Sequence, residues 1–92
     1  MRIEHKFGNL KTAIRELNEL GFSANESLIS KGLYHVLPIE MRDDYPMMGD
    51  GTTPRFVAFL YSTGTLIFVK PYDENPVLMA YQETLEKLTA SN

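Results

Sequence analysis

Two β-type segments, Arg55 to Tyr61 and Thr65 to Lys70, constrain the fold of this chain more than any other feature. Both are rich in the β-branched and aromatic residues that favour strands. The residues between them, Ser62-Thr63-Gly64-Thr65, match a type I turn in which Gly64 takes the positive φ of a G1 bulge. Because such a turn sets the pairing register, the sequence predicts an antiparallel hairpin here.

Both faces of this hairpin are apolar. Strict alternation places Phe56, Ala58 and Leu60 on one face of the first strand and Val57, Phe59 and Tyr61 on the other. A sheet with one solvated face alternates apolar with polar residues, so the second face needs a cover. Two interpretations stay open: the segment from Pro38 to Pro54 folds over this face, or Val57, Phe59 and Tyr61 form a homodimer or partner interface.

A helix precedes the hairpin in the sequence. Asn9 is a suitable N-cap, and the apolar residues that follow have the i, i+3, i+4 spacing of one helix face: Leu10, Ala13, Ile14, Leu17 and Leu20. Gly21 suits the left-handed position that ends a helix, with Phe22 then placed to contact Leu17.

A second main helix follows the hairpin. Asn75 is its expected cap and Pro76 its first residue, where the missing N–H is no loss. Glu83 and Lys87 are spaced for an i, i+4 ion pair. The expected buried face consists of Leu78, Tyr81, Leu85 and Leu88.

The remaining elements are shorter. Residues Met1 to Phe7 alternate in polarity and indicate an edge strand, with a helical or frayed lead-in as the alternative. Ser23 followed by Glu26 fits a capping box, which predicts a short helix from Ala24 to Lys31. Leu33 to Leu37 is predicted to form a strand that ends at Pro38.

Together these elements predict one α+β domain spanning residues 1–92. Its three- or four-stranded antiparallel sheet carries two main helices packed on one face, in the order (β)-α-(α)-β-β-β-α. A chain of 92 residues, 43% of them hydrophobic, has room for a single core.

Composition excludes several classes of partner and chemistry. Nine basic residues against twelve acidic give a net charge of −3, which disfavours nucleic acid because phosphate binding requires a positive surface. The absence of cysteine removes disulfides, thiol catalysis and iron–sulfur clusters. No apolar run reaches the roughly 18 residues of a membrane span, and the N-terminus with Arg2, Glu4 and Lys6 is unlike a signal peptide, so a cytoplasmic location is expected.

The long segment from Pro38 to Pro54 is the predicted partner-binding loop. Acidic groups interleaved with an aromatic and with adaptable methionines suit a basic, grooved protein surface. A solvated mobile loop is the alternative. The predicted contact residues are Glu40, Asp43, Asp44, Tyr45, Met47, Met48 and Asp50.

No catalytic, metal or cofactor site is expected. The aspartates of this loop lack the spacing of a calcium-binding loop. Gly49 to Thr53 is predicted to be a turn, because no phosphate-binding lysine motif follows it. His5 and His35 are the only histidines. His35 beside Glu40 or an aspartate would be a candidate base, but a histidine within a strand is more often a packing residue.

The helix–three-strand–helix order is similar to that of double-stranded-RNA-binding domains. That family contacts phosphate through a lysine cluster at the start of its last helix, whereas this chain has Asp73-Glu74-Asn75-Pro76 there. The resemblance is therefore one of topology, and it implies no RNA binding.

The sequence favours a non-enzymatic protein-binding module that docks its acidic loop or open sheet face on a basic partner. Small phage-encoded inhibitors resemble it in being compact, acidic and free of cysteine, and for such a protein inhibition by occlusion in the host cytoplasm is implied. The alternative is a small-molecule-binding domain, dimeric in one version, with an aromatic cleft formed by Tyr34, Phe59, Tyr61 and Tyr81.

Overall fold

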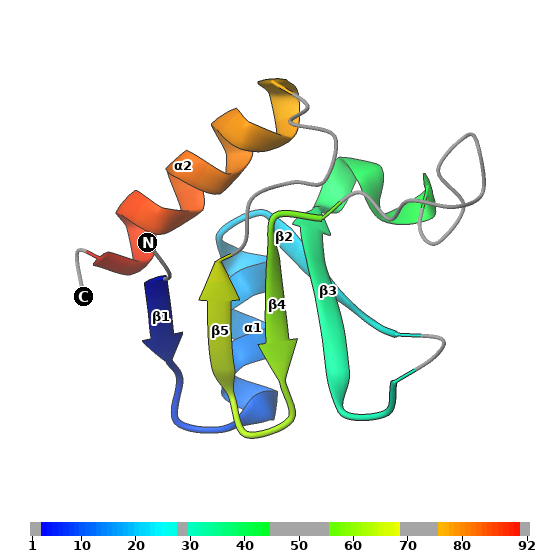
Figure 1. Cartoon of the computed structure of the whole chain (residues 1–92), viewed down its shortest axis with the longest axis vertical. Helices are drawn as coiled ribbons and strands as arrows, with labels where there is room; N and C mark the ends of the chain where they lie inside the picture. Colours follow the sequence, from blue (N-terminus) through cyan, green and yellow to red (C-terminus); the bar gives the residue numbers. More distant parts are fainter. Residues whose placement is uncertain (1–2, 28–29, 45–55, 69–75, 91–92) are drawn as a thin grey trace.

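The computed structural model describes residues 3–27, 30–44, 56–68 and 76–90. They form a five-stranded antiparallel sheet and two α-helices (Figure 1). In chain order the elements are β1 (Ile3–Lys6), α1 (Leu10–Glu19), β2 (Phe22–Glu26), β3 (Leu33–Pro38), the 3-10 helix η1 (Ile39–Asp44), β4 (Ala58–Tyr61), β5 (Thr65–Phe68) and α2 (Pro76–Ala90). The strands lie side by side in the order β1-β5-β4-β3-β2.

The predicted α+β class is confirmed, but the sheet is larger than expected. β1 is an edge strand that pairs with β5, as the alternation of the first residues predicted. The short helix predicted from Ala24 to Lys31 is wrong, because Ala24 to Glu26 belong to β2. Two strands therefore precede β3, and the observed order β-α-β-β-β-β-α departs from the α-β-β-β-α order of double-stranded-RNA-binding domains.

Side-chain alternation explains why β2 is a strand. Phe22 and Ala24 pair with Pro38 and Val36 and point to the core, whereas Ser23 and Asn25 lie on the opposite side of the sheet. The Ser23 hydroxyl, predicted to cap a helix, instead donates a hydrogen bond to Oδ1 of Asn25 at 2.8 Å.

α1 has the ends that its sequence predicts. Asn9 is the N-cap, and its Oδ1 accepts a hydrogen bond of 2.8 Å from the N–H of Thr12. Gly21 has a φ of 94°, and its N–H donates to the Asn18 carbonyl at 3.1 Å. This is the left-handed termination that turns the chain directly into β2.

α2 also begins at the predicted Pro76, although its proposed cap, Asn75, lies outside the described residues. The Glu83 and Lys87 side chains form the expected ion pair, with 3.4 Å between Oε1 and Nζ. Its buried face differs by one position. Leu78 and Leu85 are buried as expected, but Leu88 is exposed and Thr89 is buried, with its hydroxyl donating to the Leu85 carbonyl.

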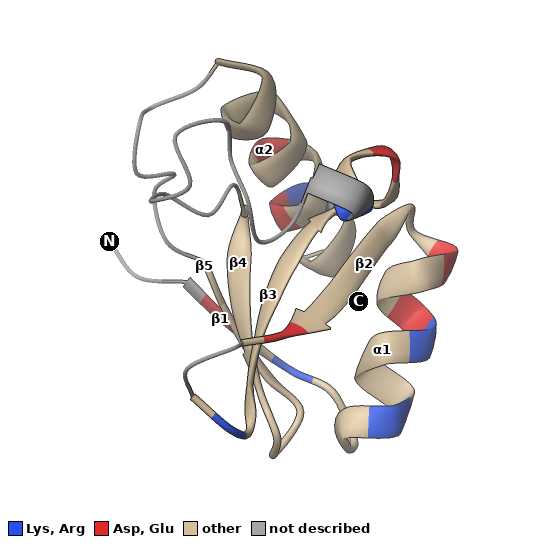
Figure 2. Cartoon of the chain, turned by 90° about the vertical axis from the view of Figure 1, so that its right-hand side faces the viewer, with Lys and Arg blue, Asp and Glu red and all other residues tan. Residues whose placement is uncertain are grey.

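Both helices contribute to a single core on one side of the sheet. α1 lies against the inner face, and α2 lies across the upper ends of the strands in Figure 1. Neither α1 nor α2 lies on the opposite, outer face (Figure 2). No helix among the described residues is long and apolar enough to cross a membrane. The buried residues of the core are Ala13, Leu17, Phe22, Val36, Val57, Ala58, Leu60, Leu66, Phe68, Leu78 and Leu85.

β4 departs from strict alternation at its first residues. Ala58 pairs with Val36, yet the N–H of the preceding Val57 also donates to the Val36 carbonyl, at 2.7 Å. Two consecutive residues, Val57 and Ala58, are thus opposite the single residue Val36, which is the pattern of a β-bulge. Both Val57 and Ala58 are fully buried, and Gln82 of α2 donates a 2.6 Å hydrogen bond from Nε2 to the Val57 carbonyl. The bulge therefore anchors α2 to the sheet.

The hairpin of β4 and β5 forms with the predicted turn. Gly64 has a φ of 90°, and its N–H donates to the Tyr61 carbonyl at 2.8 Å. The turn also packs against the start of α1, since a Cβ on Gly64 would lie 2.9 Å from the Asn9 carbonyl carbon. Gly64 is thus required by its conformation and by this close approach.

We expect Gly64→Ala to destabilise the fold more than Gly21→Ala does. Both glycines have a positive φ, which costs about 1–3 kcal/mol for other residues. Only Gly64 adds a backbone clash, because a Cβ on Gly21 meets nothing within 4 Å. Urea denaturation of the two variants measures the difference, and equal losses would contradict a role for the contact with Asn9.

Candidate functional site

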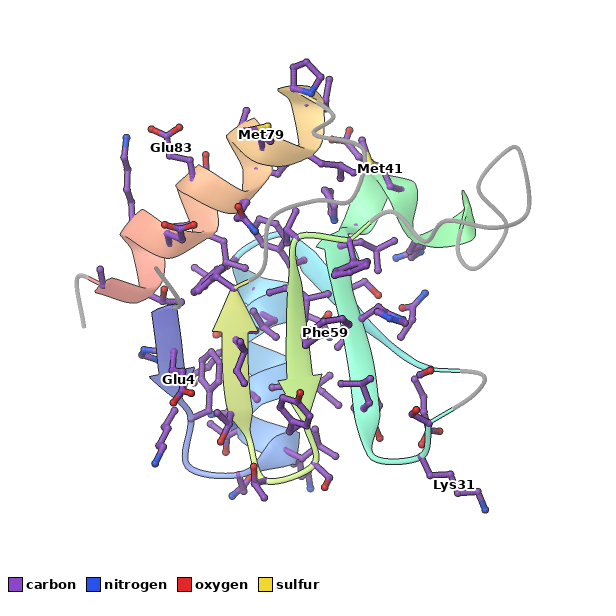
Figure 3. The ribbon with its side chains drawn as sticks, viewed as in Figure 1. Glu4, Lys31, Met41, Phe59, Met79 and Glu83 are labelled. Carbon is purple, nitrogen blue, oxygen red and sulfur yellow. The ribbon has the colours of Figure 1, made fainter. Side chains whose placement is uncertain are left out.

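The outer face of the sheet, the side away from α1, is the candidate site. Cross-strand pairing assigns its residues, because His35 pairs with Phe59 and Phe59 with Ile67. Figure 3 shows Phe59 in front of β4, on the side opposite α1. The residues of the outer face on the three central strands are Leu33, His35, Leu37, Phe59, Tyr61, Thr65 and Ile67.

Three rings form a cluster on this face. His35 lies 4.9 Å from Phe56 and 5.3 Å from Phe59, measured between ring centroids, and the two phenylalanine rings are 4.7 Å apart. These separations are those of packed aromatic pairs. Phe56 joins the cluster because the bulge at Val57 turns it outward, toward Phe59 three residues later.

Exposure varies along the outer face. Leu37 and Ile67 are 1% and 7% exposed, and His35 is 9% exposed, so this part of the face is covered. Phe56 and Phe59 are half-buried, and Tyr61, at the end of β4, is 38% exposed. The accessible aromatic surface is therefore concentrated around Phe59 and Tyr61.

Val57 does not belong to the surface that the sequence predicted for it. Strict alternation grouped it with Phe59 and Tyr61, but it is fully buried in the core on the inner side. The reason is the bulge, which places Val57 and Ala58 on the same side. No feature of the sequence predicts this bulge, because both faces of the segment are apolar.

The predicted acidic loop is described only in part. Its first residues form η1, not an irregular segment, and Glu40 is exposed there. Asp43 and Asp44 belong to η1, although their side chains lie outside the description. Tyr45, Met47, Met48 and Asp50 also lie outside the described residues.

η1 is attached to the sheet at β2 and β3. Nδ2 of Asn25 donates to the Arg42 carbonyl at 3.5 Å, and Met41 packs against the core. The labelled Met41 in Figure 3 lies at the end of the sheet near α2. The exposed Glu40 is therefore held on a short helix adjoining the sheet.

The aromatic cleft expected for a small-molecule site does not form from its four predicted residues. Tyr34 pairs with Leu60 and points to the core, and Tyr81 of α2 packs against Phe22 with ring centroids 6.2 Å apart. Phe59 and Tyr61 lie on the opposite side of the sheet. The sheet itself separates the two pairs.

On its three central strands the outer face offers the chemistry of a neutral aromatic surface, whereas β1 at the edge adds the charged Glu4 and Lys6. Burial lowers the pKa of His35 from its ordinary value, because the charged imidazolium loses its hydration. Among the described residues, no three His, Asp or Glu side chains gather where they would hold a metal ion. The arrangement suits contact and packing.

Comparison of the chain with protein-family models, curated proteins and solved structures gives no match. Its function is therefore argued from the geometry of the site.

The lowered pKa of His35 predicts a pH-dependent stability. In the unfolded chain this histidine takes up a proton near its ordinary pKa of about 6.5, whereas the folded chain binds the proton only at lower pH. At a pH between the folded and the unfolded pKa, the unfolded state binds more protons than the folded state does. His35 therefore leaves the free energy of unfolding unchanged above pH 6.5 and lowers it as the pH falls below that value. One such group changes the free energy of unfolding by at most about 1.4 kcal/mol per pH unit.

Chemical denaturation at pH 7.5 and at pH 5.0 tests this. We expect His35→Phe to reduce the stability lost at pH 5.0, because the substituted ring has no proton to bind. His5→Gln on β1 is the matched control. An unchanged pH dependence in His35→Phe would show that the contribution comes from other groups.

Proposed function

We propose that this chain is a non-enzymatic protein-binding module whose contact surface is the outer face of its sheet around Phe59 and Tyr61. The observation that carries the proposal is the position of these two aromatic side chains. They are accessible on a side of the sheet where neither α1 nor α2 covers them. Aromatic residues are enriched in protein interfaces, and tyrosine is frequent among the few residues that carry most of the binding energy.

Preorganisation supports the same proposal. The Phe59 ring packs against both His35 and Phe56, and its strand lies in the middle of the five-stranded sheet. A side chain fixed before binding loses little conformational entropy when it becomes buried in an interface. Tyr61, which is 38% exposed, adds an aromatic ring with a hydroxyl group that can hydrogen-bond to a partner or to water.

Charge favours a basic partner. The net charge of the chain is −3, and Glu40 is exposed on η1 at the start of the acidic loop. η1 follows the Pro38 end of β3, whereas Tyr61 pairs with Leu33 at the other end, so this charge would steer the approach of a partner, which speeds association and selects among partners. Tyr61 and Phe59 would provide contact area, and the acidic loop from Pro38 to Pro54 would orient the partner.

Occlusion of the partner's own functional surface is the mode of action that this arrangement favours. Such inhibition needs a rigid surface and a complementary charge, and it places no demand on a catalytic group. Small phage-encoded inhibitors have this profile, and the chain resembles them in being acidic and free of cysteine.

Site-specific photocrosslinking tests the contact surface. A photoreactive phenylalanine analogue at position 61 is expected to form a covalent adduct with a protein of the native host, identified by mass spectrometry. The same analogue at Thr84, exposed on α2, is the matched control and should give no adduct. Glu40→Lys should reduce the yield at position 61, because it removes attraction for a basic surface.

Two other outcomes would overturn the proposal. An adduct only between two copies of the chain would assign the outer face to a homodimer. Failure to crosslink any macromolecule, together with a metabolite that raises the melting temperature, would favour the small-molecule-binding alternative.

A further inference from the structure

β2 forms one edge of the sheet and pairs only with β3 among the described strands. Residues of an antiparallel pair alternate between those that hydrogen-bond to the neighbouring strand and those that face away from it. The bonds from Ser27 N–H to the Leu33 carbonyl at 2.8 Å, and from Ile39 N–H to the Gly21 carbonyl at 3.1 Å, fix the phase. Ser23 and Asn25 therefore bond to β3, and Ala24 turns its N–H and C=O toward the outside of the sheet.

The two edges of the sheet differ in their protection. On β1, the residues that turn away from the neighbouring strand, Glu4 and Lys6, are charged and exposed. Charged residues, lysine above all, discourage pairing with another strand. β2 contains no lysine, arginine or proline. Its one charged residue, Glu26, is exposed at the end of the strand, and the residue at its centre is the small Ala24. Figure 2 looks onto this edge, and no described segment passes in front of it.

We infer that β2 is the interface of a homodimer, in which the β2 strands of two copies pair antiparallel about a two-fold axis at Ala24. Each Ala24 would exchange two N–H···O=C bonds with Ala24 of the other copy, and the two sheets would join into one. A two-fold axis makes the same surface serve both partners, which an antiparallel strand edge permits without any change of sequence. This inference stands apart from the proposed function, because it uses the edge and not the outer face.

α1 supplies the argument for a second copy of this chain as the occupant. It runs beside β2 on the inner side of the sheet (Figure 2). Its basic residues, Lys11 and Arg15, lie in the first half, and its acidic residues, Glu16 and Glu19, lie in the second half. A two-fold axis at Ala24 brings the two α1 helices antiparallel, so the basic half of each would lie toward the acidic half of the other. The opposed helix dipoles add to this attraction.

The expected affinity follows from the size of the contact. Pairing along one five-residue strand buries less than the roughly 1,000 Å² of a stable interface, so contacts between the α1 helices must add to it. Association should therefore depend on concentration over the range in which the protein is studied.

Sedimentation equilibrium from micromolar to millimolar protein tests the inference. We expect the mass to rise from that of one chain to that of two. Ala24→Pro removes an outward N–H without removing a bond between β2 and β3, and proline is tolerated at such edge positions. The variant should keep its circular dichroism spectrum and weaken dimerisation about tenfold or more, because two symmetry-related hydrogen bonds are lost.

The control variant is Tyr61→Ala, which changes the outer face and should leave dimerisation intact. A mass of one chain at every concentration would overturn the inference, as would an Ala24→Pro variant that dimerises like the parent. If that variant fails to fold, amide exchange of the parent chain decides. Exchange of the Ala24 N–H must slow as the concentration rises, and a rate independent of concentration would also overturn the inference.

Discussion

The organisation of the molecule depends on one irregular pairing, in which Val57 and Ala58 of the β4 segment both face Val36 of β3. The extra residue turns Val57 into the core, where its carbonyl accepts the hydrogen bond from Gln82 and so positions α2. The bulge also places Phe56 on the outer face, where its ring packs against those of His35 and Phe59. A regular strand would have left Val57 on the outer face and Phe56 in the core. The bulge thus accounts both for the attachment of α2 to the sheet and for the aromatic cluster on the outer face.

Local signals in the sequence predicted the elements whose ends are defined by specific residues. α1 is bounded by the Asn9 cap and the positive φ of Gly21, and the hairpin is fixed by Gly64. In each case a backbone group is satisfied by a neighbour a few residues away, so the outcome depends little on the rest of the fold. The start of α2 at Pro76 was also predicted from a local signal, because proline suits the first position of a helix.

Elements that depend on distant partners were predicted less well. Ser23 and Glu26 have the spacing of a capping box, but pairing with β3 provides hydrogen bonds that a short isolated helix does not match. The alternation of Phe22 and Ala24 with Ser23 and Asn25 was the available signal for a strand. The bulge at Val57 left no comparable signal, because every residue around it is apolar. Of the predicted partner face, Phe59 and Tyr61 are accessible, whereas Val57 is in the core.

The outer face and the β2 edge are compatible surfaces. A two-fold axis perpendicular to the sheet at Ala24 would place the outer faces of both copies on the same side of a continuous sheet, with the α1 helices on the other. Phe59 and Tyr61 would then occur twice on one surface. A partner with repeated sites would bind such a dimer more tightly than it binds one copy, since the second contact becomes intramolecular. Self-association through the edge would thus strengthen binding through the outer face without altering either contact.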